Sequence, residues 1–175
     1  EVDLLAPTVG VMRYSQWVTQ GILSYNTYQG TSTAAPLVTG TIGLMFSLRP
    51  ELPADEVETI LKLTAKRIDH IEANAPFKGH YGAGMLQSGA AIDLVSRLYD
   101  AEGVAVLKDQ KFSRWRQKLT AFNRVVILKD IQFTEQSEFT LRAKKQIILK
   151  PGTLLAPENN KGIKLSVDPG LTITP

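Results

Sequence analysis

Residues 35–48 constrain the fold most strongly, because their pattern is helical and apolar on nearly every face. A helix without a polar face is normally buried in the centre of a domain. Gly40 and Gly43 each cost about 1 kcal/mol relative to alanine inside a helix, so we expect a close backbone approach there. Pro36 is compatible with the helix because it falls in the first turn. The segment therefore predicts a helix that is covered on all sides.

Seven mostly small residues lead into this helix: Gly30-Thr31-Ser32-Thr33-Ala34-Ala35-Pro36. A serine at a helix N-terminus is usually only an N-cap. Ser32 has a second interpretation, because free backbone N–H groups at the start of a buried helix can stabilise a developing oxyanion. Small neighbours would also let a substrate carbonyl approach its hydroxyl. The motif thus indicates a candidate nucleophile at Ser32, supported by Gly30, Thr31, Thr33, Ala34 and Pro36.

The motif resembles the nucleophile segment of the subtilisin-like serine proteases, Gly-Thr-Ser-Met-Ala-(Ala/Ser)-Pro, which opens a central buried helix in that family. Further segments are similar to the family's and follow in the same order: residues 2–7, 50–57, 63–65 and 81–86. Thr33 replaces the usual methionine, Thr8 stands where glycine is frequent, and Gln87 where asparagine is frequent. The resemblance covers about residues 1–95. It implies an α/β fold, the C-terminal half of a subtilisin-like parallel-sheet domain with a central buried helix.

The resemblance also implies a mechanism. Ser32 would attack the scissile peptide carbonyl and form an acyl-enzyme, and its own backbone N–H would donate one oxyanion hydrogen bond. In the family the catalytic Asp, His and oxyanion Asn precede the serine, and none has a counterpart here. His70 and His80 follow Ser32 and lie outside the family's His motif. We therefore expect an incomplete serine protease that is inactive alone.

The family further indicates what the chain works with and where. The expected partners are a protein or peptide substrate and the N-terminal part of the same protease domain. No cofactor and no metal ion are implied. The family points to a secreted or cell-surface location in a bacterium.

Charge and glycine content divide the chain into two regions. Residues 1–100 carry 7 basic and 10 acidic side chains, whereas residues 101–175 carry 13 basic and 7 acidic ones, and nine of the 13 glycines lie in the first region. Cysteine is absent, which excludes disulfides and thiolate metal sites. We expect the half protease domain at 1–100, a connector at 101–119 and a small β-strand-rich module at 120–175.

Local patterns predict the remaining elements of the first region. Pro53 is a favourable first helical residue, and acidic side chains follow it in the first turns. Another helix is expected over 88–98. The apolar run 2–5 and the β-formers of 22–28 predict two strands.

The C-terminal part is rich in short strand patterns, over 125–128, 139–141, 146–149 and 163–167. Pro-Gly turns follow the last two. The segments KQIILKPG and IKLSVDPG resemble each other weakly, but two copies are too few to predict a solenoid. We expect an independent, antiparallel, all-β C-terminal module, similar to small modules at the ends of secreted bacterial proteases.

Two other functions remain open. A non-catalytic binding protein could keep a protease-like fold. Residues 108–118 place Phe112 and Trp115 among lysines and arginines, a composition that can bind polyanions, although a solvated segment with Trp115 packed inward is more common. We expect no nucleic-acid partner. We also expect no membrane span, because the longest apolar run, 34–48, is short and interrupted by polar residues.

Overall fold

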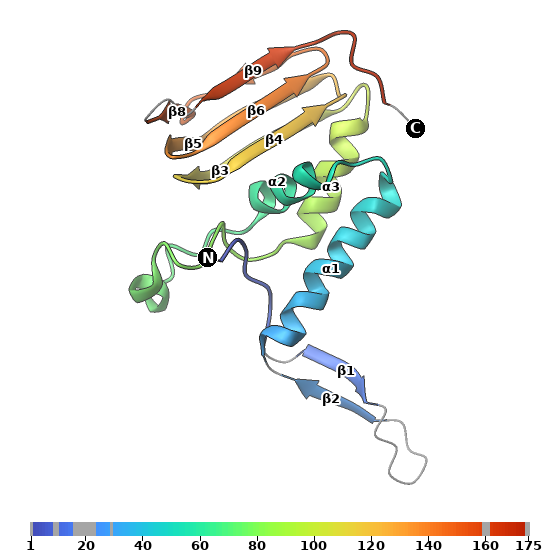
Figure 1. The fold of residues 1–175 in the computed structure, drawn as a ribbon, viewed down its shortest axis with the longest axis vertical. Helices are drawn as coiled ribbons and strands as arrows, with labels where there is room; N and C mark the ends of the chain where they lie inside the picture. Colours follow the sequence, from blue (N-terminus) through green and yellow to red (C-terminus); the bar gives the residue numbers. More distant parts are fainter. Residues whose placement is uncertain (1, 9–10, 16–23, 29, 159–161, 174–175) are drawn as a thin grey trace.

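The computed structural model describes the chain except residues 1, 9–10, 16–23, 29, 159–161 and 174–175. An antiparallel hairpin of β1 (Val11–Ser15) and β2 (Ser24–Tyr28) lies at one end of the molecule (Figure 1). Helices occupy the middle: α1 (Thr31–Leu48), α2 (Ala54–Thr64), the short 3-10 helix η1 (Glu72–Phe77) and α3 (Ser88–Tyr99). The other end holds strands β3 (Val104–Phe112), β4 (Arg116–Ala121), β5 (Val125–Glu135), β6 (Glu138–Ala143), β7 (Ile147–Leu149), β8 (Leu154–Pro157) and β9 (Ile163–Val167).

Most of the expected elements are present. The helix from Pro53 and the helix over 88–98 are confirmed as α2 and α3. The strand expected at 22–28 is confirmed over Ser24–Tyr28, and residues 22 and 23 lie outside the described residues. The run 2–5 forms only an isolated parallel bridge, between Leu5 and Met85.

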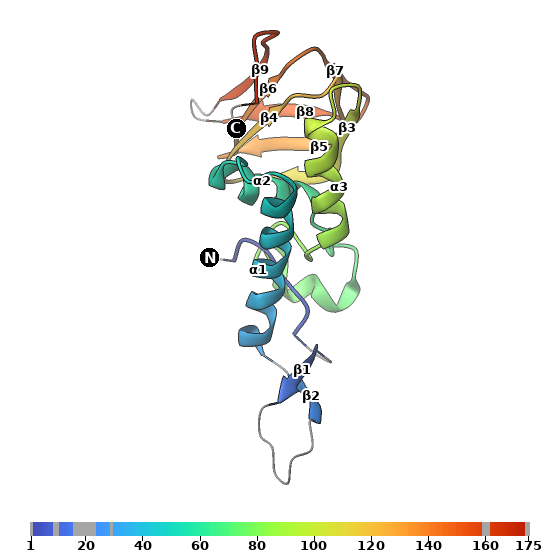
Figure 2. The ribbon, with the colours of Figure 1, turned by 90° about the vertical axis from the view of Figure 1, so that its right-hand side faces the viewer.

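Strands β3 to β9 form two parallel sheets. One sheet has the order β3-β5-β7, with β8 also paired to β5, and the other has the order β4-β6-β9. The chain alternates between the sheets, from β3 to β4, then β5, β6, the pair β7 and β8, and β9. Each passage through both sheets makes one coil, and the coils stack as a solenoid (Figures 1 and 2). The expected antiparallel pairing is therefore wrong.

The strand register keeps the coils aligned. Each strand of one coil pairs with the corresponding strand of the next coil, so that the first residue of β3 pairs with the first of β5, and the first of β4 with the first of β6. Equivalent side chains consequently stack across the coils. In one sheet Leu107 lies beside Leu128, and in the other Leu119 lies beside Leu141; all four are buried.

A sequence signal for this repeat exists. The β3 sequence VAVLKDQKF and the start of β5, VVILKDIQF, share their first valine, the run LKD and the final phenylalanine, and these shared residues pair in the sheet or flank paired residues. The weak repeat between KQIILKPG and IKLSVDPG does not follow the coils. The first segment contains β7 and the second contains β9, and these strands belong to different sheets, so the segments do not occupy equivalent positions in successive coils.

A column of left-handed backbone positions marks the same repeat. Asp109 and Asp130 have φ of 58° and 49°, and Gly152 has φ of 83°. A Cβ at Gly152 would lie 2.1 Å from Asp130 Oδ1, so only glycine fits there without displacing the aspartate.

One continuous hydrophobic core joins the helices to the strands, running from Met45 to Ala143. The Phe122 N–H donates to the Leu98 carbonyl at the end of α3 (2.7 Å). The β strands therefore share their hydrophobic core with the helices, and their independence as a module stays a prediction. Residues 101–119, expected to be a connector, instead contain β3 and most of β4. Their outward-facing lysines and arginines conceal the alternation of buried residues in the sequence.

The first residues of the chain are tied to this core through a buried lysine. Lys62 is 1% exposed, and its Nζ lies 2.9 Å from Asp3 Oδ1. The same ammonium sits 4.2 Å from the ring centroid of Trp115, and it also pairs with Glu58. These contacts offset the cost of burying the charge.

Two glycines let three backbone segments pass close together. Gly82 and Gly84 have φ of 69° and 129°, and a Cβ on either would lie within 2.4 Å of a backbone oxygen, that of Asp3 or of Lys66. Hydrogen bonds join the segments, including Ala83 N to Asp3 O at 2.9 Å and Met85 N to Lys66 O at 2.9 Å. Gly82 and Gly84 lie in segment 81–86, which resembles the subtilisin-like family, and their lack of a side chain is what allows this close approach.

Helix α1 is not the covered helix that its sequence predicts. Its buried residues are Thr41 and Met45, whereas Leu44 is 54% exposed and Leu48 is 45% exposed. A Cβ at Gly40 or Gly43 would meet no described atom within 4 Å, so the expected close approach is absent.

The reason for this exposure is the arrangement around the helix. Helix α1 packs mainly against α3, and within the described residues no sheet covers its other side (Figures 1 and 2). By length and composition alone α1 could cross a membrane, but core helices of soluble proteins share these properties. The expected absence of a membrane span stays a prediction.

Candidate active site

The head of α1 presents Ser32 on the surface. Gly30 precedes the helix with φ of 125°, and Ser32, in the first turn, is exposed. Thr33 fastens the turn, because its Oγ1 donates to the Gly30 carbonyl at 2.6 Å and its N–H donates to the same oxygen at 3.0 Å. Within the described residues the Ser32 hydroxyl makes no hydrogen bond. The N-cap interpretation of Ser32 is wrong, because Gly30 occupies that position.

The supporting residues of the motif share this surface. Thr31 and Pro36 are exposed, while Thr33 and Ala34 are half-buried against the helix. Pro36 lies inside α1 rather than in its first turn, since the helix begins at Thr31. It has no N–H to donate to the Ser32 carbonyl, which weakens the hydrogen-bond ladder at this turn. The Ser32 carbonyl therefore lacks its usual donor within the helix.

The electrostatics of a helix start favour negative charge. The first N–H groups of α1 have no partner within the helix, and they carry the positive end of its dipole. Its first turn contains no acidic side chain that would neutralise this end. An oxyanion formed beside Ser32 would consequently meet a favourable field.

The two histidines do not join Ser32. His70 and His80 are exposed and flank η1, which lies away from the start of α1 in both views (Figures 1 and 2). His70 lines a surface cavity with Arg67, Asp69 and residues of the β strands, and Ser32 is not among the lining residues of that cavity. The described residues also contain no group of three or more His, Cys, Asp or Glu side chains suited to a metal ion.

Comparison with known proteins decides what this site resembles. The sequence model of the subtilase family matches residues 1–84, which include the hairpin, α1, α2, Gly82 and Gly84. Residues 1–84 are therefore similar to subtilase sequences. The match ends before α3 and the β solenoid, so the similarity to subtilases is confined to the N-terminal half of the chain.

Curated relatives agree with this assignment. An extracellular protease of Xanthomonas campestris pv. campestris is 35% identical over 94 residues, which are 52% of this chain and 15% of that protein. Calcium-dependent proteases of Trichormus variabilis and of a Nostoc species are each 36% identical over 72 residues, 39% of this chain and 11% of theirs. The chain therefore spans a small part of these relatives. No solved structure matches it.

Two buried polar residues near the core escaped the sequence analysis. Lys62 and Glu56 lie on α2, where a charged side chain normally faces water. Glu56 accepts hydrogen bonds from the N–H and the hydroxyl of Thr120, and burial raises the pKa of its carboxyl. Asp3, which pairs with Lys62, and Thr120, which donates to Glu56, lie far along the chain, so the local pattern does not reveal that these two side chains are buried.

Proposed function

We propose that this chain is part of a serine endopeptidase of the subtilisin type, with Ser32 as its nucleophile. The observation that supports this most is the coincidence of two findings. The subtilase match covers the motif around Ser32, and the Ser32 hydroxyl lies exposed at the positive end of α1. The names of the relatives, all proteases, agree with a peptidase role.

In the proposed reaction the Ser32 hydroxyl attacks the peptide carbonyl carbon and loses its proton to a histidine base. The carbonyl oxygen gains the negative charge, and the backbone N–H of Ser32 donates to it. The amine leaves with a proton from the same histidine, and water then hydrolyses the acyl-enzyme. We place the base, its Asp and the second oxyanion donor outside these 175 residues, because His70 and His80 lie away from the start of α1.

The proposed setting is outside the cell. One relative is named an extracellular protease, which favours a secreted or cell-surface protein. The proposed substrates are proteins or peptides.

The test compares three proteins: this chain, the full-length gene product that contains it, and that product with Ser32→Ala. Each is treated with a fluorogenic peptide and a fluorophosphonate probe, which labels activated serines. We expect labelling and hydrolysis only in the intact full-length protein. Loss of the nucleophile should lower turnover by about 10⁴–10⁶-fold, the range measured for triad residues in subtilisin, a member of this family.

A matched control is Ser47→Ala. Ser47 lies on the same helix, is also exposed, and donates only to the Gly43 carbonyl, at 2.9 Å. Its replacement should leave hydrolysis unchanged. Activity that survives Ser32→Ala would refute the proposal, and a full-length protein that neither labels nor hydrolyses would favour a binding protein with a protease-like fold.

A further inference from the structure

The first edge strands of the two sheets, β4 and β3, differ in whether other residues occupy their outward backbone groups. At the β4 edge the Lys118 N–H donates to Thr59 Oγ1 (3.1 Å), and the Thr120 N–H donates to Glu56 Oε2 (3.1 Å). Side chains of α2 thus occupy the hydrogen-bonding groups of that edge. Unpaired edges of this kind are sites where other strands add, so capping them protects the fold.

The edge of β3 has no such cap over residues 104–108. The Gly103 carbonyl accepts from Arg124 N at 3.1 Å, so it points toward β5. Backbone groups of alternate residues point to opposite edges of a strand, so the N–H and C=O groups of Val106 and Lys108 point away from β5. Within the described residues no hydrogen bond occupies them. Near the far end of the strand, Gln110 instead reaches the Ala65 carbonyl and closes the edge.

A cavity lies against this open edge. Its volume is about 720 Å³, and residues of α3, of β3 and of the segment after α2 line it. Helix α3 lies next to β3 in Figure 2. Val104 and Val106 are 38% and 43% exposed there, which offers apolar contact beside the free backbone groups. Over residues 104–108 the edge is about 16 Å long, enough for an added strand of ordinary length.

The charge of the residues that line this cavity favours an acidic ligand. Four basic residues line the cavity against two acidic ones. Asp93 is already paired with Arg97 (2.7 Å), and Asp109 lies 3.4 Å from Lys108. Lys66 and Arg67 add positive charge beyond these pairs, although Arg67 also pairs with Asp69. A strand carrying acidic side chains would complement this lining better than a basic one.

We propose that the open edge of β3 binds an extended acidic peptide segment of a partner protein by strand addition. The backbone of the peptide would pair with Val106 and Lys108, and its acidic side chains would face the basic lining. This binding site is separate from Ser32 and does not depend on peptide hydrolysis.

The test uses a fluorescein-labelled heptapeptide of alternating valine and glutamate, with fluorescence anisotropy as the readout. Every protein variant in this test also carries Ser32→Ala, so that Ser32 cannot hydrolyse the labelled peptide. The result is therefore independent of the proposed function. We expect the glutamate peptide to bind at least about tenfold more tightly at low salt than the same peptide with lysine. Methylation of its backbone nitrogens should abolish binding, because strand addition needs those donors.

The decisive variant is Val106→Pro, which removes one N–H from the open edge. Proline is tolerated on an edge strand when its nitrogen faces away from the sheet, and circular dichroism and urea unfolding check that the variant folds. We expect at least about tenfold weaker binding. Val167→Pro is the matched control, because β9 bonds to β6 through Gly162 and Asp168, so the Val167 N–H points to the outer edge of β9.

Three outcomes would overturn the proposal. They are no binding of the glutamate peptide, binding that Val106→Pro leaves unchanged, and binding that Val167→Pro weakens instead. If Val106→Pro does not fold, Lys66→Glu with Lys108→Glu replaces it. That pair should reverse the preference between the two peptides, and an unchanged preference would equally refute the site.

Discussion

Replacing Glu56 by alanine tests the contact between α2 and the edge of β4. Glu56 is 1% exposed, and its carboxylate accepts from Thr120 N at 3.1 Å and from Thr120 Oγ1 at 2.7 Å. Alanine would leave both donors without this partner at a helix–sheet contact. A buried donor without a partner costs about 1–3 kcal/mol. Since Thr120 is only half-buried, water replaces part of the loss, and we expect about 2–4 kcal/mol of destabilisation.

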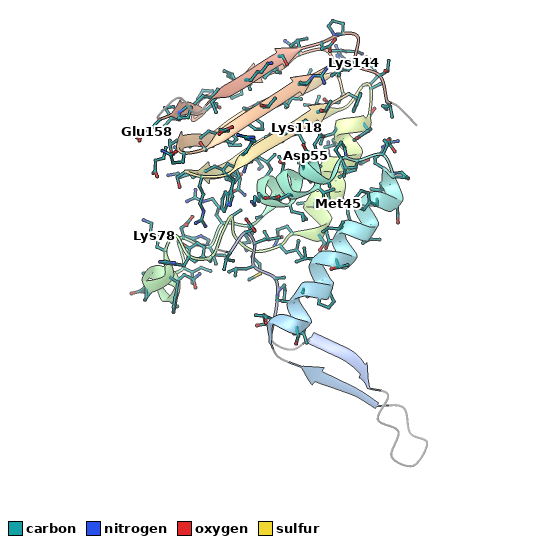
Figure 3. All side chains as sticks on the ribbon, viewed as in Figure 1. Met45, Asp55, Lys78, Lys118, Lys144 and Glu158 are labelled. Atoms are coloured by element: carbon teal, nitrogen blue, oxygen red, sulfur yellow. The ribbon has the colours of Figure 1, made fainter. Side chains whose placement is uncertain are left out.

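Asp55 supplies the matched control. It is the neighbouring acid on α2, and its Oδ2 lies 3.0 Å from Lys118 Nζ on the same strand (Figure 3). Both side chains are about half exposed, at 56% and 46%. Exposed ion pairs contribute roughly 0–1 kcal/mol, so Asp55→Ala should cost less than about 1 kcal/mol.

The assay is urea unfolding at pH 7, followed by far-UV circular dichroism. A double-mutant cycle with Thr120→Val isolates the interaction, and we expect a coupling free energy of about 1–3 kcal/mol between Glu56 and Thr120. An equal cost for Glu56→Ala and Asp55→Ala would refute the reasoning, because burial would then make no difference. A coupling free energy near zero would refute it as well.

The same residue should make stability depend on pH. Burial raises the pKa of Glu56 above its ordinary value of 4.5, against the opposing hydrogen bonds from Thr120. The raised pKa adds a pH-dependent part to the free energy of unfolding, separate from the hydrogen bonds to Thr120. This part is complete below about pH 4.5, and it is lost as the pH rises through the raised value. Glu56→Gln, which cannot ionise, should show a flatter dependence of the urea midpoint between pH 4.5 and 7.

Two further pairs of variants test the packing. Gly84→Ala would place a Cβ 2.4 Å from the Lys66 carbonyl oxygen at φ of 129°, so we expect the free energy of unfolding to fall by at least about 2–3 kcal/mol. Gly89→Ala in α3 meets no atom within 4 Å, and it should raise the free energy of unfolding by about 0.5–1 kcal/mol. Thermal unfolding compares the two melting temperatures, and a shift of the same sign in both would contradict the steric account. Phe133→Ala should cost about 3–5 kcal/mol because the side chain is fully buried within the solenoid, whereas Phe77→Ala, at 61% exposure, should cost less than about 0.5 kcal/mol. Urea unfolding measures both, and similar costs would mean that the solenoid interior is loosely packed.

Local patterns in the sequence were sufficient for several features. The small-residue motif around Ser32 identified the start of α1, and the subtilase match later agreed with the resemblance carried by that motif. Alternating apolar residues and Pro-Gly turns identified β9 and the positions of β5 to β7. These features depend on residues within a few positions of each other, so periodicity and turn chemistry predict them.

Strand pairing could not be obtained from the same patterns. An alternating strand has the same appearance whether its neighbours are parallel or antiparallel. The likeness of VAVLKDQKF and VVILKDIQF, which indicates parallel stacking, becomes visible only when segments a full coil apart are compared.

Burial was decided by tertiary structure alone. Composition makes α1 a core helix, yet within the described residues it is covered mainly by α3, and Leu44 remains half exposed. Conversely, Lys62 and Glu56 are charged but buried, because Asp3 and Thr120 come from distant segments of the chain to pair with them. A side chain's own chemistry sets the cost of removing it from water, and only the folded chain determines which partners offset that cost.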